Sequence, residues 1–405
     1  MAAIGKRGEG RFAAGTPSLL RAMNERGVLE FIRERGPVSR AQLARDSGLS
    51  KPTVSQALSA LEEASLVREA GRTSGGKGPT ALLYELNPGA GWVIGLDVGA
   101  DRVRGAIADL TGQIAVRLDQ EAKATSAKAL IGQVADMAHT LADQAGAPRP
   151  KLAFAVVGSP GVFEPSTGHM AMAHNLPGWG RQGVFDDLRS QLGMEMRFEN
   201  DVNLATLGER WHGLGKGVDN FAYLHVGTGV GLGLVLHGEL YRGASGAAGE
   251  VAYLPLAAAH PRDPDNLRRG ALEAALGAEG VVEAARVAGM RGANTPRAVF
   301  DAARAGDAAA ERVVATVAER LALAIAAIVP VIDPELVILG GGIGRNGDLL
   351  LEPVEQELRA LSPFRPRIEV SALGADAELH GAVSLALEAA QDRLFARSVS
   401  SGSET

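Results

Sequence analysis

The sequence of 405 residues contains no cysteine, so disulfide bonds and thiolate-liganded metal sites are excluded. It also lacks a long apolar run, because the longest one, residues 321–332, is interrupted by Pro330 and is shorter than the roughly 20 residues that span a bilayer. Residues 1–15 carry charges and no apolar core, so we expect no secretory signal there. These features predict a cytoplasmic protein that makes no contact with a membrane.

Acidic and basic residues are distributed unevenly along the chain. The net charge is -6, yet residues 1–87 hold 13 basic and 9 acidic residues, against 28 basic and 38 acidic residues in the remainder. A basic N-terminal part on an acidic body indicates that one end meets a polyanion. The length predicts two or three domains.

Three amphipathic segments near the N-terminus, residues 21–35, 40–46 and 51–64, predict a helix-turn-helix. Gly48 suits the tight turn before the third helix, and Ser50 is placed to cap that helix at its N-terminus. The side chains expected in its core are Met23, Val28, Leu29, Ile32, Leu43, Ala44, Val54, Leu58 and Leu61.

Polar side chains remain on the outer face of the third helix, and a basic hairpin follows it. Residues 66–69 and 81–86 alternate like strands around a glycine-rich tip, as in the wing of a winged helix. The residues expected to contact DNA are Lys51, Thr53, Ser55, Gln56, Arg72 and Lys77. The alternative is a three-helix unit that only contacts other proteins.

From Trp92 onward the pattern predicts two α/β lobes facing one another across a cleft. The first lobe is expected to hold strands at 92–99, 104–108, 113–118 and 152–157 and a helix at 126–144. The second is expected to hold strands at 221–226, 231–236 and 336–339.

Several loops of this body carry groups that suit ligand binding. The glycine-rich loop 227–233 offers backbone amides to an anion but lacks the lysine of a P-loop. Asn200 and Asp201 follow a strand, where they suit vicinal hydroxyls or, equally, the capping of a helix. Glu250 and Glu273 lie in similar segments, and each taken alone is more typical of a solvated surface charge.

Taken together and in order, these motifs resemble the ROK family of repressors and sugar kinases. The matching segments are Asp97-Val98-Gly99, Gly158 to Gly161, Asn175 to Trp179, Glu199-Asn200-Asp201, Gly227 to Gly233, Gly243 to Glu250 and Gly340 to Gly342. The resemblance implies an α/β fold class, with an N-terminal winged helix-turn-helix followed by a two-lobed actin-like ATPase body. It implies a DNA-binding domain at 16–88, a first lobe at 90–200 with a C-terminal helix at about 379–395, and a second lobe at 201–378.

The resemblance also implies the residues that bind the sugar, and it implies a vestigial rather than a working catalytic base at Asp201. The ligand contacts carried over are Gly161, Asn200, Asp201, Glu250, Tyr253 and Glu273. Tyr253 stands where the family has a histidine that touches sugar and zinc. Because the family's zinc loop is rich in cysteine, we expect no metal here, and His260 is expected to be a lone surface histidine.

A further departure concerns ATP. The family's kinases usually have Gly-Gly-Thr where this chain has Gly99-Ala100-Asp101, so a carboxylate replaces a hydroxyl beside the phosphates. We therefore expect no cofactor and no enzymatic activity.

The resulting expectation is a homodimeric or homotetrameric repressor that binds double-stranded operator DNA and is released by a sugar. One alternative is an ATP-dependent sugar kinase with an added DNA-binding domain. Another is a partner-binding protein with a vestigial cleft. Residues 398–405 are expected to form a disordered polar tail.

Overall fold

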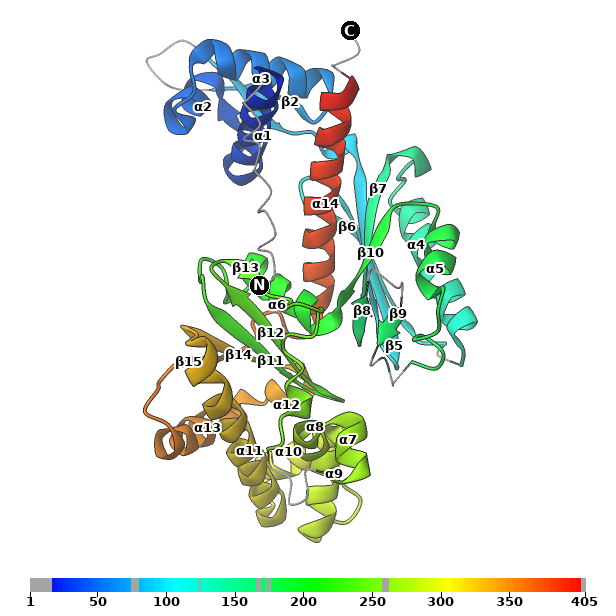
Figure 1. Cartoon of the computed structure of the whole chain (residues 1–405), viewed down its shortest axis with the longest axis vertical. Coiled ribbons are helices and arrows are strands. Elements are labelled where there is room, and N and C mark those ends of the chain that lie inside the picture. Colours follow the sequence, from blue (N-terminus) through cyan, green and yellow to red (C-terminus); the bar gives the residue numbers. More distant parts are fainter. Residues whose placement is uncertain are drawn as a thin grey trace, which may run out of the picture. The chain divides into compact units, whose positions relative to one another are not determined.

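Three helices and a small sheet form the N-terminal part of the chain in a computed structural model (Figure 1). The helices are α1 (Pro17–Arg35), α2 (Arg40–Ser47) and α3 (Lys51–Glu63). The second and third lie within one residue of the predicted bounds, and α1 begins four residues before the predicted start at residue 21. The structure describes residues 17–73, 80–123, 125–164, 169–171, 173, 176–256 and 262–401.

Local hydrogen bonds explain where α2 and α3 begin and end. Ser39 caps α2 by accepting a hydrogen bond from the Gln42 amide at 3.2 Å, and Gly48, with φ of 73°, ends that helix. The Ser50 hydroxyl accepts a hydrogen bond from the Thr53 amide at 3.3 Å at the start of α3. The predicted turn and cap are therefore confirmed.

The helical core contains all but two of the side chains expected there. Val28, Leu43 and Leu58 are fully buried, and Ala44 is half-buried against the core. Met23 is 62% exposed, so its predicted burial was wrong. At 100° per residue it lies about 140° around the helix axis from Val28, outside the buried stripe.

A three-stranded antiparallel sheet in the order β1-β3-β2 completes this part of the chain. Its strands are β1 (Val38–Ser39), β2 (Val67–Arg72) and β3 (Leu82–Leu86). The predicted wing strands are thus present, with β2 beginning one residue later and ending three residues later than expected and irregular between Glu69 and Gly71. The wing tip, including Lys77, lies outside the described residues.

The chain divides into two compact units, and the smaller one also takes in segments from far along the sequence. This head unit comprises residues 1–92, 109–113 and 388–405, and the body unit comprises the rest. In the head unit, Leu394 and Phe395 pack against the helical core, and Arg26 forms an ion pair with Asp392 at 2.8 Å. Arg26 belongs to α1, and Asp392 belongs to α14 (Ala377–Ser401). The expected disordered tail was wrong for residues 398–401, because α14 runs through to Ser401; residues 402–405 lie outside the described part.

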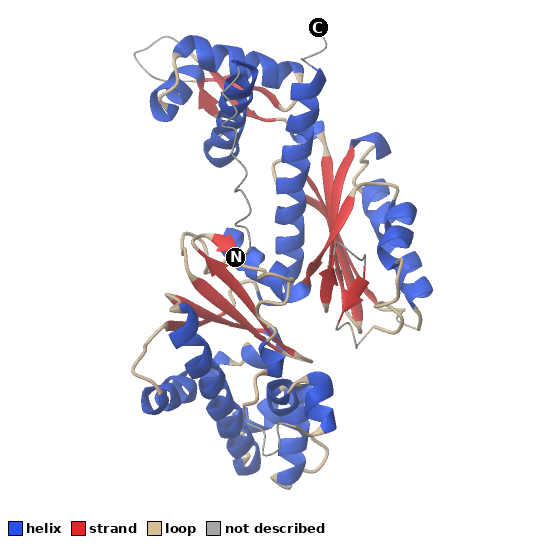
Figure 2. Cartoon of the chain, viewed as in Figure 1, coloured by secondary structure: helices blue, strands red, loops and turns tan. Residues whose placement is uncertain are grey.

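The body unit contains two five-stranded sheets (Figure 2). The first, in the order β10-β7-β4-β5-β6, consists of β4 (Trp92–Val98), β5 (Arg102–Asp109), β6 (Ile114–Glu121), β7 (Leu152–Ser159) and β10 (Met196–Asn200). The second, in the order β13-β12-β11-β14-β15, consists of β11 (Phe221–Val226), β12 (Val230–Leu236), β13 (Glu239–Leu240), β14 (Leu336–Gly340) and β15 (Arg367–Val370). A separate hairpin is formed by β8 (Val162–Glu164) and β9 (His169–Ala171). The two predicted α/β lobes are confirmed.

Helices accompany each sheet. In the first lobe these are α4 (Ala127–Gln144) and α5 (Val184–Leu192), which pack on each other. The remaining helices are α6 (Asp201–His212), α7 (Pro264–Arg269), α8 (Ala271–Leu276), α9 (Ala278–Val287), α10 (Pro296–Arg304), α11 (Ala308–Ile332), α12 (Gly341–Gly344) and α13 (Gly347–Leu361).

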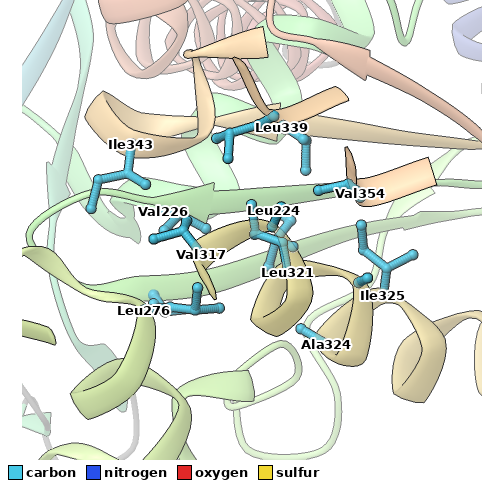
Figure 3. Packing of buried hydrophobic residues seen from close by; sticks show 14 of the residues in the cluster. Leu224, Val226, Leu276, Val317, Leu321, Ala324, Ile325, Leu339, Ile343 and Val354 are labelled. Carbon is cyan, nitrogen blue, oxygen red and sulfur yellow. The ribbon is translucent and has the colours of Figure 1, made fainter. Parts of the chain in front are cut away.

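The core of the second lobe lies between its sheet and α11. Leu224 and Val226 of β11 belong to the same buried cluster as Val317 and Leu321 of α11 (Figure 3). In the described part of the chain, α11 is the one helix that is long and apolar enough to cross a membrane, judged by length and composition alone. Its apolar side chains instead pack in this core, which accounts for its hydropathy.

Candidate functional site

A cavity of about 590 Å³ lies in the body unit, lined by residues of both lobes. Its wall includes the end of β4, the junction of β10 with α6, the loop between β11 and β12, and the start of α14. All six ligand contacts named from the sequence line this one cavity: Gly161, Asn200, Asp201, Glu250, Tyr253 and Glu273. Their binding of a ligand stays a prediction.

Asn200 fixes the geometry at the start of α6. Its side-chain oxygen accepts a hydrogen bond from the Asn203 amide at 3.1 Å, and its amide group donates to the Gly161 carbonyl at 3.1 Å. Gly161 has a φ of 98°, and a Cβ there would lie 2.4 Å from the Ala171 carbonyl, so only glycine fits. Asn200 is thus both a helix cap and a clamp on the facing loop, and Asp201 follows it into the cavity.

The loop that carries Glu250 is held against β12. Gly249 has a φ of 91°, and a Cβ there would approach the Leu232 carbonyl oxygen to 1.7 Å. The Gly249 carbonyl accepts a hydrogen bond from the Leu232 amide at 3.0 Å. This close backbone contact places Glu250 in the cavity wall at the start of the short 3-10 helix Val251–Tyr253.

Glu273 and Tyr253 are each tied to a neighbouring backbone group. Glu273, in α8, accepts a hydrogen bond from the Val230 amide at 3.1 Å, so it sits on the glycine-rich loop between β11 and β12. The Tyr253 hydroxyl donates to the Arg268 carbonyl at 3.2 Å. Tyr253 therefore closes one side of the cavity from a position where it is 37% exposed.

Burial raises the pKa of two of the acid groups named as ligand contacts, Asp201 and Glu250. Burial raises the pKa of Asp201, while the nearby His225 opposes that rise. Burial also raises the pKa of Glu250, and the charges of Asp201 and Glu273 add to the effect. Carboxylates gathered in this way offer strong acceptors to hydroxyl donors and disfavour an anionic ligand.

Three ionisable side chains of the cavity, Arg104, His225 and Glu378, were not anticipated as site residues. Arg104 of β5 pairs with Asp97 at 2.6 Å and lies 3.6 Å from Glu378 of α14. His225 Nδ1 lies 4.0 Å from Glu378 Oε1. The available sequence signal was an arginine in a largely apolar strand, with Val103 and Gly105 on either side.

The outer surface of α3 carries the side chains expected to contact DNA. Lys51 and Gln56 are exposed, whereas Thr53 and Ser55 are half-buried, and the Thr53 hydroxyl lies 2.7 Å from the Ser50 hydroxyl. Arg72, at the end of β2, is exposed. An exposed polar N-terminal turn on the third helix is the arrangement by which a helix-turn-helix enters the major groove.

Comparison with known proteins identifies the family to which the body of this chain belongs. Residues 93–389 match the ROK family. The chain belongs to the ROK family. Residues 21–76 match the MarR family, which agrees with the winged helix of the head unit.

Relatives of this ROK chain include both kinases and repressors. It is 30% identical over 310 residues to a glucokinase from Halalkalibacterium halodurans, covering 72% of this chain and 93% of the relative. It is 25% identical over 396 residues to a xylose repressor from Caldicellulosiruptor bescii, covering 92% of this chain and 97% of the relative. A crystal structure of a ROK family transcriptional regulator, a homologue of the E. coli MLC protein, superposes with a TM-score of 0.78 at 20% identity, covering 94% and 99% of the two chains.

The sequence predicts that this chain binds no metal ion, and the residues that bear on this prediction lie only partly within the described ranges. Within the described ranges no group of three or more histidine, cysteine, aspartate or glutamate side chains is placed to hold a metal ion. Residues 257–261, which include His260, and Asn175 lie outside the described part, so the predictions for them are untested.

Proposed function

We propose that this ROK chain is a sugar-responsive transcriptional repressor whose operator affinity falls when a sugar binds in the body cavity. The observation that carries the proposal is the combination, in one chain, of an exposed helix-turn-helix surface and a cavity lined by convergent carboxylate and amide groups. The match to a xylose repressor over 92% of the chain supports it, because an alignment of that length includes both the head and the body of this chain.

The chemistry of the cavity supports a neutral polyol as the ligand. Asn200, Asp201 and Glu250 present oxygen acceptors, and hydroxyl groups are the donors that such acceptors bind best. Seven carboxyl groups and four arginines line the cavity. Burial raises the pKa of Glu378 to about 8, and the six other carboxyl groups still outnumber the arginines, which disfavours a phosphorylated sugar. We propose a neutral sugar on this ground.

The body is proposed to act by linkage rather than by catalysis. A sugar that binds one conformation of the body better than another shifts the population of conformations, and any conformation with lower operator affinity then becomes dominant. A homodimer or homotetramer in the cytoplasm is proposed as the active form, because paired recognition helices match paired operator half-sites. No cofactor is proposed.

The second candidate is an ATP-dependent sugar kinase with an added DNA-binding domain. The position of Asp201 in the cavity and the 30% identity to a glucokinase favour it. Asp101, which lines the same cavity where the family's kinases have a hydroxyl, and Tyr253 in place of the family's histidine weigh against it.

A thermal-shift screen against neutral and phosphorylated sugars, with and without Mg-ATP, separates the candidates. The repressor proposal expects stabilisation by a neutral sugar without ATP, and loss of that shift in Asp201→Asn. Stabilisation that requires ATP, accompanied by ADP release, would instead favour the kinase. The sugar found is then added to a complex with DNA selected from a random pool by the purified protein, where release of the DNA is expected.

A further inference from the structure

An ion pair joins the two sheets of the body unit beside the predicted sugar contacts. Glu199 belongs to β10 of the first sheet, and Arg242 follows β13 of the second sheet. The Arg242 guanidinium donates to Glu199 Oε2 through Nε at 2.9 Å and through Nη2 at 2.7 Å. Glu199 is only 8% exposed, so its carboxylate depends on these donors more than on water. The pair therefore restrains the segments of the two sheets that carry it.

The other oxygen of the Glu199 carboxylate organises the start of α6. Glu199 Oε1 accepts hydrogen bonds from the Asn200 backbone amide at 3.2 Å and from the Asn203 side-chain amide at 3.0 Å. Asn200 and Asp201, two of the predicted sugar contacts, lie at this end of the helix. The first turn of α6 is thus attached to the same carboxylate that Arg242 binds.

Arg242 is attached in a similar way to the loop that carries Glu250. Its carbonyl accepts a hydrogen bond from the Ala248 amide at 3.2 Å, two residues before Glu250. The loop also lies against β8 at Gly246, where a Cβ would be 3.2 Å from the Val162 side chain. Gly246, Ala248 and Glu250 all line the cavity. Arg242 therefore fixes this part of the cavity wall through its carbonyl and, through its side chain, connects the wall to β10.

We propose that Glu199 and Arg242 are positioning residues for the sugar site. Their ion pair holds the first turn of α6 at a fixed distance from the loop that carries Glu250, so that acceptors from the two lobes converge on one sugar. Glu199 and Arg242 are not among the residues that line the cavity, so they act through their neighbours. The inference deepens the proposed function and rests on it for the identity of the ligand.

Calorimetry on the full chain tests the proposal, with the neutral sugar that the thermal-shift screen selects from a panel containing D-glucose and D-xylose. Arg242→Met removes the charge but keeps an unbranched side chain, and we expect it to raise the sugar Kd about tenfold. Arg197→Met is the matched control. Arg197 is 38% exposed against 40% for Arg242, and it contacts the same Glu199 oxygen at 3.4 Å. Because Arg197 lies on the same strand as Glu199, this contact does not join the sheets, and the Kd should stay unchanged.

A second variant covers the case in which Arg242→Met fails to fold because Glu199 loses its bidentate cation. Glu199→Gln combined with Arg242→Met removes both charges and should show the same loss of sugar affinity. Where the single variants also fold, their effects on the Kd should not add, because both residues act through one contact. A folded variant whose Tm falls while its sugar Kd stays at the wild-type value would overturn the proposal, and so would additive effects.

Hydrogen exchange without sugar separates this inference from the proposed function. Loss of the ion pair should speed amide exchange in residues 242–250 and in the first turn of α6, whereas Arg197→Met should leave both at the wild-type rate. Wild-type exchange rates in Arg242→Met would contradict the positioning role. A wild type that binds no sugar of the panel, with exchange changed as expected, would contradict the proposed function and leave the ion pair as the contact that fixes the loop.

Discussion

At the scale of single residues, the proposed preference of the cavity for a neutral sugar comes from carboxyl groups that are partly buried. Asp201 directly follows Asn200, which caps α6. Glu250 follows Gly249, where a Cβ would collide with the Leu232 carbonyl, so that position must be glycine. Because both positions are fixed by the backbone, their oxygens are preorganised for a ligand rather than ordered by it. Preorganised groups lose little entropy on binding.

Replacing either carboxylate with its amide should therefore weaken sugar binding without unfolding the protein. A hydrogen bond to a charged group contributes about 1.5–3 kcal/mol, so we expect Asp201→Asn and Glu250→Gln each to raise the sugar Kd roughly tenfold to hundredfold. Calorimetry with the sugar from the screen measures this. Glu283→Gln, an exposed change on α9, is the control. Equal Kd values in all four proteins would remove both residues from the sugar site.

Glu378 gives the stability of the folded chain a specific pH dependence. Burial raises the pKa of Glu378 to about 8 from its ordinary value of 4.5, and the charge of Asp97 adds to the rise. The folded chain thus binds this proton more tightly than the unfolded chain, so the contribution favours folding at low pH and is lost as the pH rises through about 8.

Glu378→Gln, which stays neutral, should flatten the fall of Tm between about pH 4.5 and pH 8, the range between the unfolded and the folded pKa. Differential scanning fluorimetry across that range measures it, with the exposed change Glu355→Gln as the control. Parallel curves for the wild type and Glu378→Gln would show that Glu378 does not titrate in this window.

The sequence identified individual site residues through ordered motifs, and it missed those whose role depends on a distant partner. Asn200, Asp201 and Glu250 were named because each lies in a short segment with a recognisable pattern. Arg104 and Glu378 were not, because they come from β5 and α14 and meet only in the folded chain. No local pattern records such a pair.

At the scale of the element, we expect α3 to contact DNA in two ways, through one side chain on a phosphate and another on a base edge. Lys51 is exposed at its first position, and Gln56 is exposed one and a half turns later. A lysine contacts a phosphate as a point charge, whereas a glutamine contacts a base edge by paired hydrogen bonds.

Lys51→Ala should therefore weaken binding to all DNA sequences alike and reduce the slope of log Kd against log salt by about 0.9. Gln56→Ala should instead relax the preference at one base pair, at a cost of about 1–3 kcal/mol on the selected site alone. Fluorescence anisotropy at several salt concentrations, on selected and scrambled DNA, measures both. Arg297→Ala, an exposed cation of the body, is the control. A uniform loss in Gln56→Ala would place that residue on a phosphate.

Elements with strong local signals could be predicted, and those stabilised by distant contacts could not. The caps at Ser39 and Ser50 involve neighbours within three residues, so α2 and α3 begin where the sequence indicates. The polar composition of residues 398–401 predicted disorder, yet they extend α14, whose preceding turns pack through Leu394 and Phe395 on the helical core of the head unit. Tertiary packing overrides local composition there.

At the scale of the whole molecule, the head unit is assembled from three separate parts of the chain. It takes in residues 109–113 and the segment from 388 onward, and the Gln391 side chain donates to the Leu110 carbonyl at 3.2 Å. A linear reading of the sequence assigns these segments to the body. The chain therefore passes between the two units more than once, which is a physical basis for energetic coupling between them.

Coupling of this kind must be reciprocal if the sugar is the effector. The factor by which saturating sugar raises the operator Kd has to equal the factor by which saturating operator raises the sugar Kd, and couplings of this class span about 5-fold to 150-fold. Anisotropy with labelled operator gives the first factor, and calorimetry with sugar in the presence of operator gives the second. Scrambled DNA should leave the sugar Kd unchanged, and Glu250→Gln should require more sugar for the same release of operator. Two factors of one would mean that the cavity does not control DNA binding. Unequal factors would mean that a third equilibrium, such as assembly of the subunits, is linked to one of the ligands.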